Sequence, residues 1–508
     1  MSREVNHLHP ITVVLSFLSS LKNFVIPMAV IFLGKGFRFS LNPNSEHFIE
    51  TLISLGVIIL VICVIFILAF IKWKRFVYWF EDGELRIEHG LFVKKKRYIP
   101  FERIQSLNYK EGILHRPFKL VKVSIETAAE SGGEAEADLK AITHEQATMI
   151  ELEMKKAKYP LKQVATHDSE DDSNVVNHYD QKEQPIPSAI IHRMSKKDLL
   201  ILATTSSGIG VVFSGLAAIL SQFNDWIPYE QLYGEFQAFI KFGALLITIV
   251  TIVVLIISWL ISVAITFLNN FGFSVEKEED KLFISKGLLE KRRMTIPMKR
   301  IQGVRIVENP FRQLFGYATI VIESAGSSGE KDEQKIVMVP LVKKQQALTI
   351  LKKLFPEEQW EFPLQRAPKK ALLRYMVKHV YWLAPVTVAV SYFTYPYGLW
   401  SLLLLPLALL LGFWQHQSAG YAKNKHQLTI VYRGISKTTF VTLKKRIQAI
   451  SLSQSYFEKR KNIATVSIHI MSGTSGSIAK IKHFDLMNME QVFWWCEPNS
   501  IQNVDGKK

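Results

Sequence analysis

The stretch that decides the class of fold reads LISLGVIILVICVIFILAFI and covers residues 52–71. It carries no charge, and Lys72, Lys74 and Arg75 follow it at once. A bilayer core of about 30 Å is crossed by about 20 apolar residues in a helix. Basic residues gather on the cytoplasmic side of such spans. The stretch therefore predicts a membrane span that ends in the cytoplasm.

Further apolar runs lie on both sides of this stretch. They cover residues 11–33, 199–220, 244–268 and 380–414. The last run is long enough for two short spans, with Tyr395 to Gly398 as the turn between them. We therefore predict about six transmembrane helices in three hairpins. A shallow re-entrant hairpin is the alternative for the last pair.

Charge and cysteine content bound the surroundings of the chain. The net charge of +17 predicts an anionic neighbour, and beside apolar spans that neighbour is the anionic inner leaflet of the bilayer rather than nucleic acid. The loop at residues 224–239 carries acidic residues but no Lys or Arg, so the soluble parts are predicted to be cytoplasmic. With two cysteines, the chain predicts no disulfide framework, no metal site and no cofactor.

The tripeptide Arg-Ile-Gln occurs three times and organises the chain. Its arginines are Arg103, Arg300 and Arg446, and the glutamines are Gln105, Gln302 and Gln448. Each arginine lies 32 residues after the end of the preceding apolar run. Long self-similar units of this kind indicate a duplicated architecture.

The surroundings of the tripeptide repeat as well. The first two units share a glycine thirteen residues before the arginine, Gly90 and Gly287, and a proline three residues before it. Short alternating runs in each unit predict strands, and a helix-like segment closes each unit, at residues 144–158, 343–355 and 487–496. Each unit therefore predicts a small β-barrel with a C-terminal helix.

This pattern after a hydrophobic hairpin resembles the bacterial pleckstrin-homology-like membrane proteins of the YdbS/YdbT type. The resemblance covers most of the chain and is greatest to the three-module, YdbT-like members. It implies a pleckstrin-homology-like (PH-like) barrel in each module, a plasma-membrane location and a smaller homologous membrane protein as partner. A homo-oligomer is the alternative to that partner. It gives no catalytic residues to carry over.

The expected boundaries follow from the runs and the repeats. Hairpins are predicted at 11–71, 198–268 and 379–414, modules at 72–158, 269–356 and 415–497, an acidic flexible linker at 159–197, a basic linker at 357–378 and a tail at 498–508.

Two basic clusters at matched positions are the candidates for binding anionic lipid or a partner. They are Lys94, Lys95, Lys96 and Arg97 in the first module and Lys291, Arg292 and Arg293 in the second. Each cation near an anionic surface contributes about 1 kcal/mol. The alternative is that these residues only set the topology of the spans. For the repeated arginines, a structural salt bridge is favoured over a grip on phosphate.

No motif of an enzyme is present, and no catalytic residue is predicted. The sequence favours a non-enzymatic scaffold or interaction protein of the bacterial plasma membrane, with cell-envelope stress or defence as a candidate process. The alternative class is a lipid-handling or transport protein whose six helices form a pathway.

Overall fold

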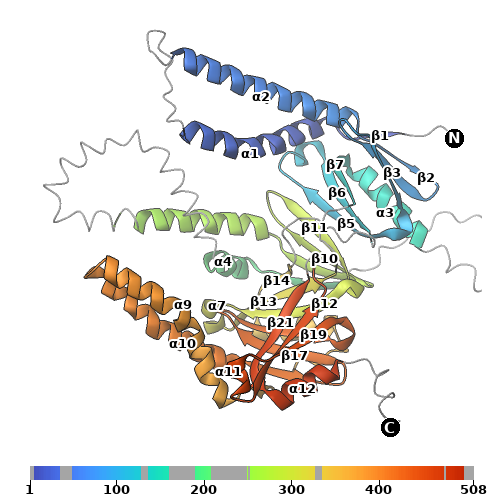
Figure 1. Ribbon diagram of the computed structural model, residues 1–508. Helices are drawn as coiled ribbons and strands as arrows, with labels where there is room; N and C mark the ends of the chain where they lie inside the picture. The colour runs from blue at the N-terminus through green and yellow to red at the C-terminus, as the bar shows by residue number, and fades with distance from the viewer. Residues whose placement is uncertain are drawn as a thin grey trace, which may run out of the picture.

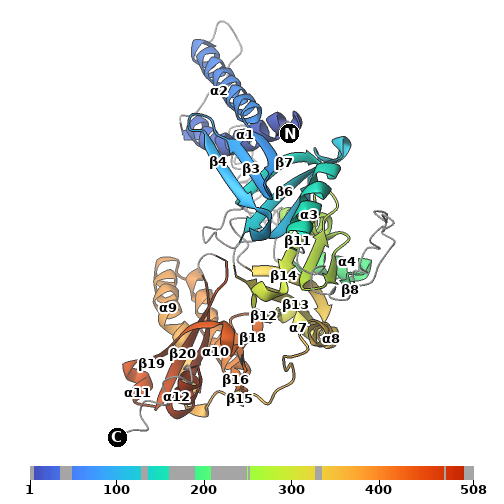
Figure 2. The ribbon, with the colours of Figure 1, turned by 90° about the vertical axis from the view of Figure 1, so that its right-hand side faces the viewer.

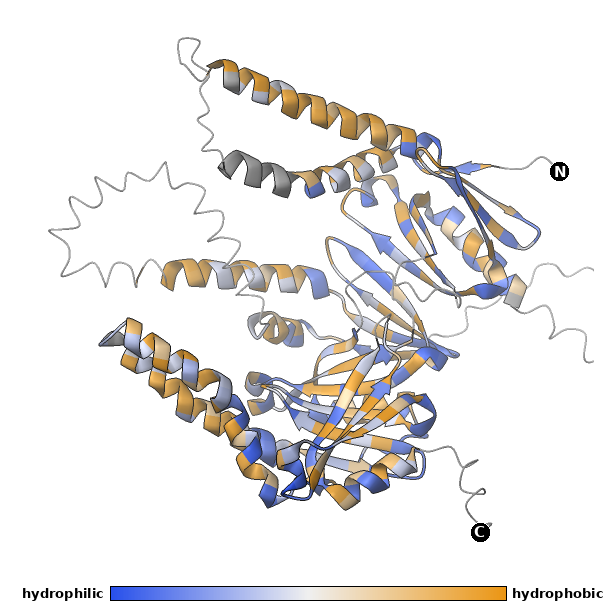
Figure 3. Cartoon of the chain, in the orientation of Figure 1, coloured by the Kyte–Doolittle hydropathy of each residue, from blue (hydrophilic) through white to orange (hydrophobic). Residues whose placement is uncertain are grey.

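The structure is a computed structural model, and it describes residues 5–34, 48–127, 136–158, 189–206, 249, 252–325, 335–473 and 476–496. Three β-rich modules follow one another in chain order, and the apolar helices of all three extend to the same side (Figures 1 and 2). Hydrophobic residues cover these helices, whereas the strands alternate between hydrophobic and hydrophilic residues (Figure 3).

The first module is built from seven strands and the α3 helix, beside the α1 and α2 helices. Its strands are β1 (Asn6–His7), β2 (Val77–Glu81), β3 (Glu84–His89), β4 (Lys95–Pro100), β5 (Ile104–Glu111), β6 (Leu120–Thr127) and β7 (Ala137–Thr143). Its helices are α1 (Ile11–Gly34), α2 (Phe48–Lys74) and α3 (His144–Lys158). Strand β3 shows why these segments are extended: Leu85 and Ile87 are buried, and the residues between and beside them are more exposed.

The second module repeats this order. Its strands are β8 (Ala189–Arg193), β9 (Ser274–Glu278), β10 (Lys281–Lys286), β11 (Lys291–Pro297), β12 (Ile301–Glu308), β13 (Tyr317–Ser324) and β14 (Lys335–Lys343). Its helices are α4 (Lys196–Thr204), an unlabelled helix at Ile252–Asn270, α7 (Pro310–Leu314) and α8 (Lys344–Leu354).

The third module follows the same plan. Its strands are β15 (Gln365–Arg366), β16 (Gly420–Lys423), β17 (Gln427–Arg433), β18 (Lys437–Leu443), β19 (Ile447–Ser453), β20 (Ile463–Ile470) and β21 (Ser477–Asp485). Its helices are α9 (Leu372–Phe393), α10 (Leu404–Ser418), α11 (Tyr456–Lys459) and α12 (Leu486–Trp495).

The sheets cross the boundaries between modules. Strands β5 to β7 of the first module and β8 to β11 of the second form one seven-stranded sheet through the pairing of β5 with β11. The second and third modules share a seven-stranded sheet through β12 and β18. The prediction of a β-barrel in each module therefore needs correction at these two junctions, because backbone pairing continues from one module into the next.

Each module keeps its own core between its two sheets and its last helix. In the first module, Ala147, Ile150 and Met154 of α3 close the core, and in the second Leu351 of α8 does so. Val441 of the third module joins the core of the second. Burial of this kind stabilises by about 25 cal/mol per Å² of apolar surface, so the second junction adds hydrophobic contact to its backbone bonds.

Three described helices are long and apolar enough to cross a membrane: Thr51–Lys74, Ile252–Asn270 and Gly398–Ser418. A shorter apolar helix lies at Ile11–Phe24. Most of the predicted span at 199–220 lies outside the described residues, so the number of six spans stays a prediction.

The predicted linkers need correction. A short strand precedes the first helix beside each module, and β8 and β15 fall inside the segments predicted as linkers. Each adds an edge to the sheet of its own module through pairing with β9 or β16. These strands are two to five residues long, too short for alternation to reveal them. The acidic part of the first linker, at residues 159–188, lies outside the described residues.

Candidate membrane-facing site

Each module has a first loop that is hydrogen-bonded to the end of the preceding apolar helix. In the first module Arg75, directly after α2, donates to the Leu91 carbonyl oxygen. In the second, the Leu288 amide donates to Leu268 O at 2.8 Å. In the third, Gln415 Nε2 of α10 donates to Gly434 O at 3.0 Å. The three loops therefore lie at the membrane end of their modules.

The shared glycine makes this loop. Gly90 has φ +135°, and a Cβ there would lie 1.9 Å from Val93 O. Gly287 repeats this geometry with φ +105° and 2.0 Å to Glu290 O. Glycine is the residue that accepts such a backbone without strain. The tight turn leaves Phe92 90 % exposed at its tip.

A second loop, after β5, β12 or β19, contacts the first helix beside each module or a residue flanking it. The Phe118 ring lies 5.8 Å from His9, two residues before α1. In the second module, Arg312 Nε donates to Thr205 Oγ1 at 3.1 Å, at the end of α4. In the third, Arg374 Nη2 of α9 donates to Ser455 Oγ at 2.8 Å.

Both loops expose large apolar side chains, and we call them together the membrane-facing tips. The exposed side chains are Phe92, Val93, Ile113, Leu114 and Phe118 in the first module, Leu288, Leu289, Phe311, Leu314 and Phe315 in the second, and Ile435, Tyr456 and Phe457 in the third. Acidic turns lie at the other end of the first two modules, at residues 81–83 and 278–280. Exposed apolar side chains beside basic residues are typical of a surface that enters the interface of a bilayer.

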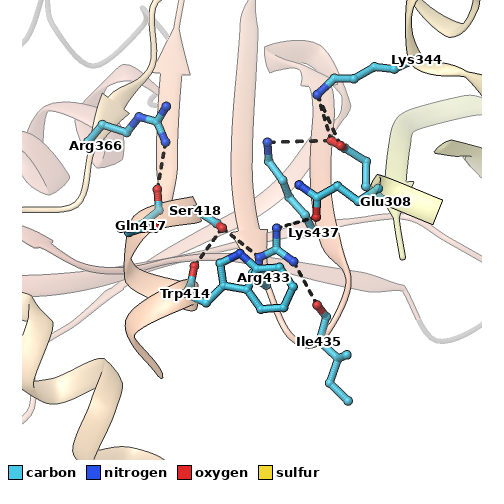
Figure 4. A network of polar contacts seen from close by, with 10 residues as sticks. Glu308, Lys344, Arg366, Trp414, Gln417, Ser418, Arg433, Ile435 and Lys437 are labelled. Atoms are coloured by element: carbon cyan, nitrogen blue, oxygen red, sulfur yellow. Dashed lines mark hydrogen bonds and ion pairs between the residues drawn. The ribbon is translucent and has the colours of Figure 1, made fainter. Parts of the chain in front are cut away.

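A polar network holds the first loop of the third module in place (Figure 4). The Arg433 guanidinium lies 3.8 Å from the centroid of the Trp414 ring and donates from Nε to Ser418 Oγ at 2.8 Å. Its Nη1 donates to Ile435 O at 3.2 Å. The network thus fixes the exposed Ile435 to the end of α10.

The predicted basic cluster of the first module begins at the tip. Lys94 to Arg97 enter β4 directly after Phe92 and Val93. Lys96 lies 3.0 Å from Glu88, and hydrogen bonds from Lys94 and Lys96 hold the pKa of Glu88 below its usual value. The anionic-lipid role of the cluster stays a prediction, and its start at the membrane end is compatible with it.

The matched cluster of the second module lies at a junction. Lys291, Arg292 and Arg293 of β11 pair with Glu111, Lys110 and Tyr109 of β5 in the first module. Lys110 Nζ lies 2.9 Å from Glu290, so an ion pair crosses this junction.

The repeated arginines have three different surroundings, although each ends a single 3-10 turn. Arg300 donates to the buried Glu126 of the first module at 3.1 Å and to Thr127 O at 3.0 Å. Arg103 is exposed, and Arg446 lies near the carboxylate of Glu358. Among the glutamines, Gln302 Nε2 donates to Arg300 O at 3.0 Å, while Gln105 is half-buried and Gln448 exposed.

A cavity of about 720 Å³ lies where α9 meets the second loop of the third module. Seven cationic side chains line it against the single carboxylate of Glu458: Lys370, Arg374, Lys378, Arg460, Lys461, Lys480 and Lys482. Its apolar wall is formed by Leu373, Val377, Tyr381, Trp382 and Phe457. We call this the basic cavity.

The cations of the basic cavity are only partly neutralised. Glu458 is engaged by Thr465 Oγ1 at 3.0 Å and by His483 Nδ1 at 2.7 Å. In the part of the chain that the structure describes, neither Lys378 nor Lys482 has a carboxylate within salt-bridge distance. Burial, then the positive charges of Lys378 and Lys480, lower the pKa of Lys482. An anion would relieve this repulsion.

The other modules fill the corresponding place with their own side chains. Lys140 of β7, at the position of Lys482, donates to Ser16 Oγ of α1 at 3.1 Å. In the second module that position is Pro340, and Arg312 bridges Thr319 and Thr205 nearby. Sequence reasoning missed the basic cavity because its cations are spread from residue 370 to residue 482 and no local pattern joins them.

Comparisons with known proteins give a family. The family described as Bacterial PH domain matches residues 25–158, 214–357 and 379–499, which are the three modules with parts of their hairpins. The UPF0699 transmembrane protein YdbT of Bacillus subtilis (strain 168) is 35 % identical over 515 residues, which cover 100 % of each chain. No solved structure matches. These matches confirm the resemblance noted in the sequence, and the chain belongs to the bacterial PH-domain family as a membrane protein with three such domains.

Proposed function

We propose that this protein is a non-enzymatic, multi-pass scaffold of the bacterial plasma membrane that holds three cytoplasmic PH-like modules against the inner leaflet. Its third module binds the headgroup of an anionic phospholipid in the basic cavity. The observation that carries the proposal is the repeated placement of exposed apolar tips beside the helices in all three modules, with an open cationic cavity at one of them.

The depth of the cavity fits a headgroup. The uncharged part of α9 starts after His379 and runs to Phe393, which gives about 21 Å of helix at 1.5 Å per residue. This is shorter than a bilayer core of about 30 Å. Arg374 and Lys378 therefore lie at the level of the phosphates when the apolar part of α9 is buried in lipid, and Trp382 lies at the interface that aromatic rings prefer.

The chemistry of the cavity fits a phosphate diester. The Nε of Arg374 is buried and has no hydrogen-bond partner among the described residues. A guanidinium offers planar, paired donors to a phosphate, and lysines add point charges. The exposed rings of Trp382 and Phe457 supply an apolar path for the acyl chains.

Native mass spectrometry of the full-length protein, titrated with phosphatidylglycerol or phosphatidylcholine in one detergent, tests the proposal. We expect phosphatidylglycerol to bind more tightly, and Lys378→Gln with Lys482→Gln to weaken it at least about tenfold, since each cation contributes about 1 kcal/mol. Lys461→Gln, which removes one cation of the same cavity instead of two, should weaken it by a smaller factor.

The matched control is Lys299→Gln with Lys353→Gln, which removes two exposed lysines outside the cavity and should leave binding unchanged. Equal binding of phosphatidylglycerol by the cavity variant and the control would overturn the headgroup site. Excess inorganic phosphate distinguishes a lipid headgroup from a free phosphate as the ligand. Displacement of the lipid by phosphate alone would mean that the cavity recognises a free anion. Retention of both lipids independently of the cavity cations would favour a lipid pathway between the helices.

A further inference from the structure

Two strands at the ends of the array have only one neighbouring strand among the described residues. The C-terminal half of one module pairs with the N-terminal half of the next, through β5 with β11 and through β12 with β18. By position in the repeat, β4 corresponds to β11 and β18, and β19 corresponds to β5 and β12. Among the described residues, β4 pairs with β3 alone and β19 with β20 alone. We call β4 and β19 the terminal edges.

The two internal junctions share one register. At the first, Glu111 lies opposite Lys291, and at the second Glu308 lies opposite Lys437. In both, the glutamate follows the repeated arginine of its own module by eight residues, and the lysine precedes its own by nine. The register of the junction is therefore a property of the repeat rather than of one pair of strands.

The same register can be extended to the terminal edges, with a glutamine in place of the glutamate. Lys94 precedes Arg103 by nine residues, and Gln454 follows Arg446 by eight. A junction between β19 and β4 in the same register places Gln454 opposite Lys94, Ser453 opposite Lys95 and Ala449 opposite Ile99.

Burial at the terminal edges differs from burial at the junctions. Val304 and Ile306 of β12 are buried, whereas their counterparts in β19, Ile450 and Leu452, are partly exposed. On the other edge, Tyr98 of β4 is 52 % exposed, although Val441 of β18 at the same position is buried. Apolar surface that the internal junctions cover is thus left open at both ends of the array.

The lysines of β4 do not argue against pairing. Charged residues often protect a sheet edge from other strands. Yet β11 carries the matched basic run Lys291 to Arg293, and all three of these residues are paired with β5 inside the chain. A basic run on this strand is therefore compatible with the junction.

We propose that a second copy of the same chain occupies each terminal edge, with β19 of one copy paired antiparallel to β4 of the next. The argument is continuity with the internal junctions, because one chain carries both halves of the same interface. Both internal junctions leave the apolar helices on one side (Figure 1). A third junction of the same kind places the helices of the next copy in the same membrane. Such a head-to-tail contact gives a ring or an open row of copies.

Disulfide crosslinking of the full-length protein in its native membranes tests the register. In a chain with Cys63→Ser and Cys496→Ser, we introduce Ser453→Cys and Lys95→Cys, two exposed positions predicted to lie opposite each other. Opposed residues in an antiparallel pair have Cα atoms about 4.5–5.5 Å apart, within the reach of a disulfide. We expect the monomer band to shift to dimers and larger species.

The matched control moves one cysteine by two residues along the strand. Ser451→Cys with Lys95→Cys separates the Cα atoms by about 8–9 Å, beyond disulfide reach. Differently tagged chains that each carry one of Ser453→Cys and Lys95→Cys should form a mixed dimer, and neither chain alone should crosslink. Crosslinking of Ser453→Cys to itself, to a different protein, or to nothing would overturn the proposal.

A charge variant tests the same junction without cysteines. Gln454→Glu places a carboxylate opposite Lys94, as Glu111 and Glu308 lie opposite their lysines. An opposite-charge pair across strands contributes about 0.2–1 kcal/mol, so the association constant of copies should rise about 1.4- to 5-fold. Gln454→Lys should lower it by a similar factor. Equal association of both variants, measured by mass photometry, would contradict the predicted register.

Discussion

Arg300→Met should loosen the first junction and leave the second intact. The Arg300 guanidinium donates to Glu126 at 3.1 Å and to Thr127 O at 3.0 Å, with side-chain exposures of 15 % for Arg300 and 8 % for Glu126. Without Arg300, the carboxylate keeps Ser106 and Asn108 as donors, each at 2.7 Å. Breaking a buried ion pair costs about 3–5 kcal/mol. Because Arg300 is partly exposed and two donors remain, we expect about 2–4 kcal/mol.

The stability loss in Arg300→Met should depend on pH, and the pKa of Glu126 gives the direction of this dependence. Burial raises the pKa of Glu126, although Ser106, Arg300 and Asn108 oppose the shift. A raised folded-state pKa means that the contribution of this carboxyl to stability is present at low pH and is lost as the pH rises. Loss of Arg300 raises the pKa of Glu126 further. The defect of Arg300→Met should therefore be smaller at pH 5 than at pH 8.

Hydrogen exchange of the full-length protein measures the effect locally. A loss of about 2–4 kcal/mol corresponds to exchange about 30- to 1,000-fold faster in β5 and β11. Strands β12 and β18 serve as the internal reference. Arg103→Met is the matched control, because Arg103 has the same place in the repeat and is exposed. Exchange in β5 and β11 that changes less than about threefold, or as much as in β12 and β18, would refute the reasoning.

Three further predictions concern the second junction and the tips. Burial, then the charge of Glu357, raises the pKa of Glu358 to about 7. The contribution of this carboxyl to stability is therefore present below about pH 4.5 and is lost as the pH rises through 7. In thermal unfolding, Glu358→Gln should stabilise the protein by about 2–3 kcal/mol at pH 8.5 and little at pH 5. Gly303→Val should destabilise by about 1–3 kcal/mol, because a Cβ there lies 2.6 Å from the buried Phe440 ring, and exchange in β12 and β18 would show it. With a fluorophore attached to a membrane-facing tip of the second module, Phe311→Ser with Leu314→Ser should lower the quenching of that fluorophore by lipid-bound quenchers. The thermal unfolding of the protein should stay unchanged.

The repeat and the apolar runs could be predicted from the sequence because both are local patterns. The alternation of Leu85 and Ile87 and the shared Gly90 follow from the backbone geometry that they require. The sharing of sheets could not be predicted in this way. A strand such as β5 has the same alternation whether its second neighbour comes from its own module or from the next.

The candidate site shows the same division. The cluster that begins at Lys94 is continuous in sequence and could be found, although its counterpart at Lys291 proved to lie at a junction. The basic cavity depends on α9 and β21 meeting in space, which brings Lys378 beside Lys482. The exposure of apolar residues such as Leu314 could not be predicted from the sequence, because it is set by the neighbours that the fold provides.

The junction between two copies of the chain should be weaker than the first junction between modules of one chain. His469→Glu should reduce this difference. Glu126 lies opposite Ser106, and Glu323 lies opposite Gly303; the same place opposite Ala449 in the third module is His469. At the second junction Glu323 is bound by Arg305 instead of the repeated arginine. At a junction between copies built like the first, Arg103 of the next copy meets His469 where Arg300 meets Glu126.

A carboxylate at position 469 gives Arg103 the kind of partner that Arg300 has in Glu126, so the crosslinked fraction and the association constant should rise in His469→Glu. The gain should vanish when Arg103→Met is added, since the pair is then incomplete. A gain that persists without Arg103 would place the new carboxylate against another cation and contradict the head-to-tail register. Without this carboxylate, the junction between copies lacks the ion pair that Arg300 and Glu126 form across the first junction, which favours weaker association between chains.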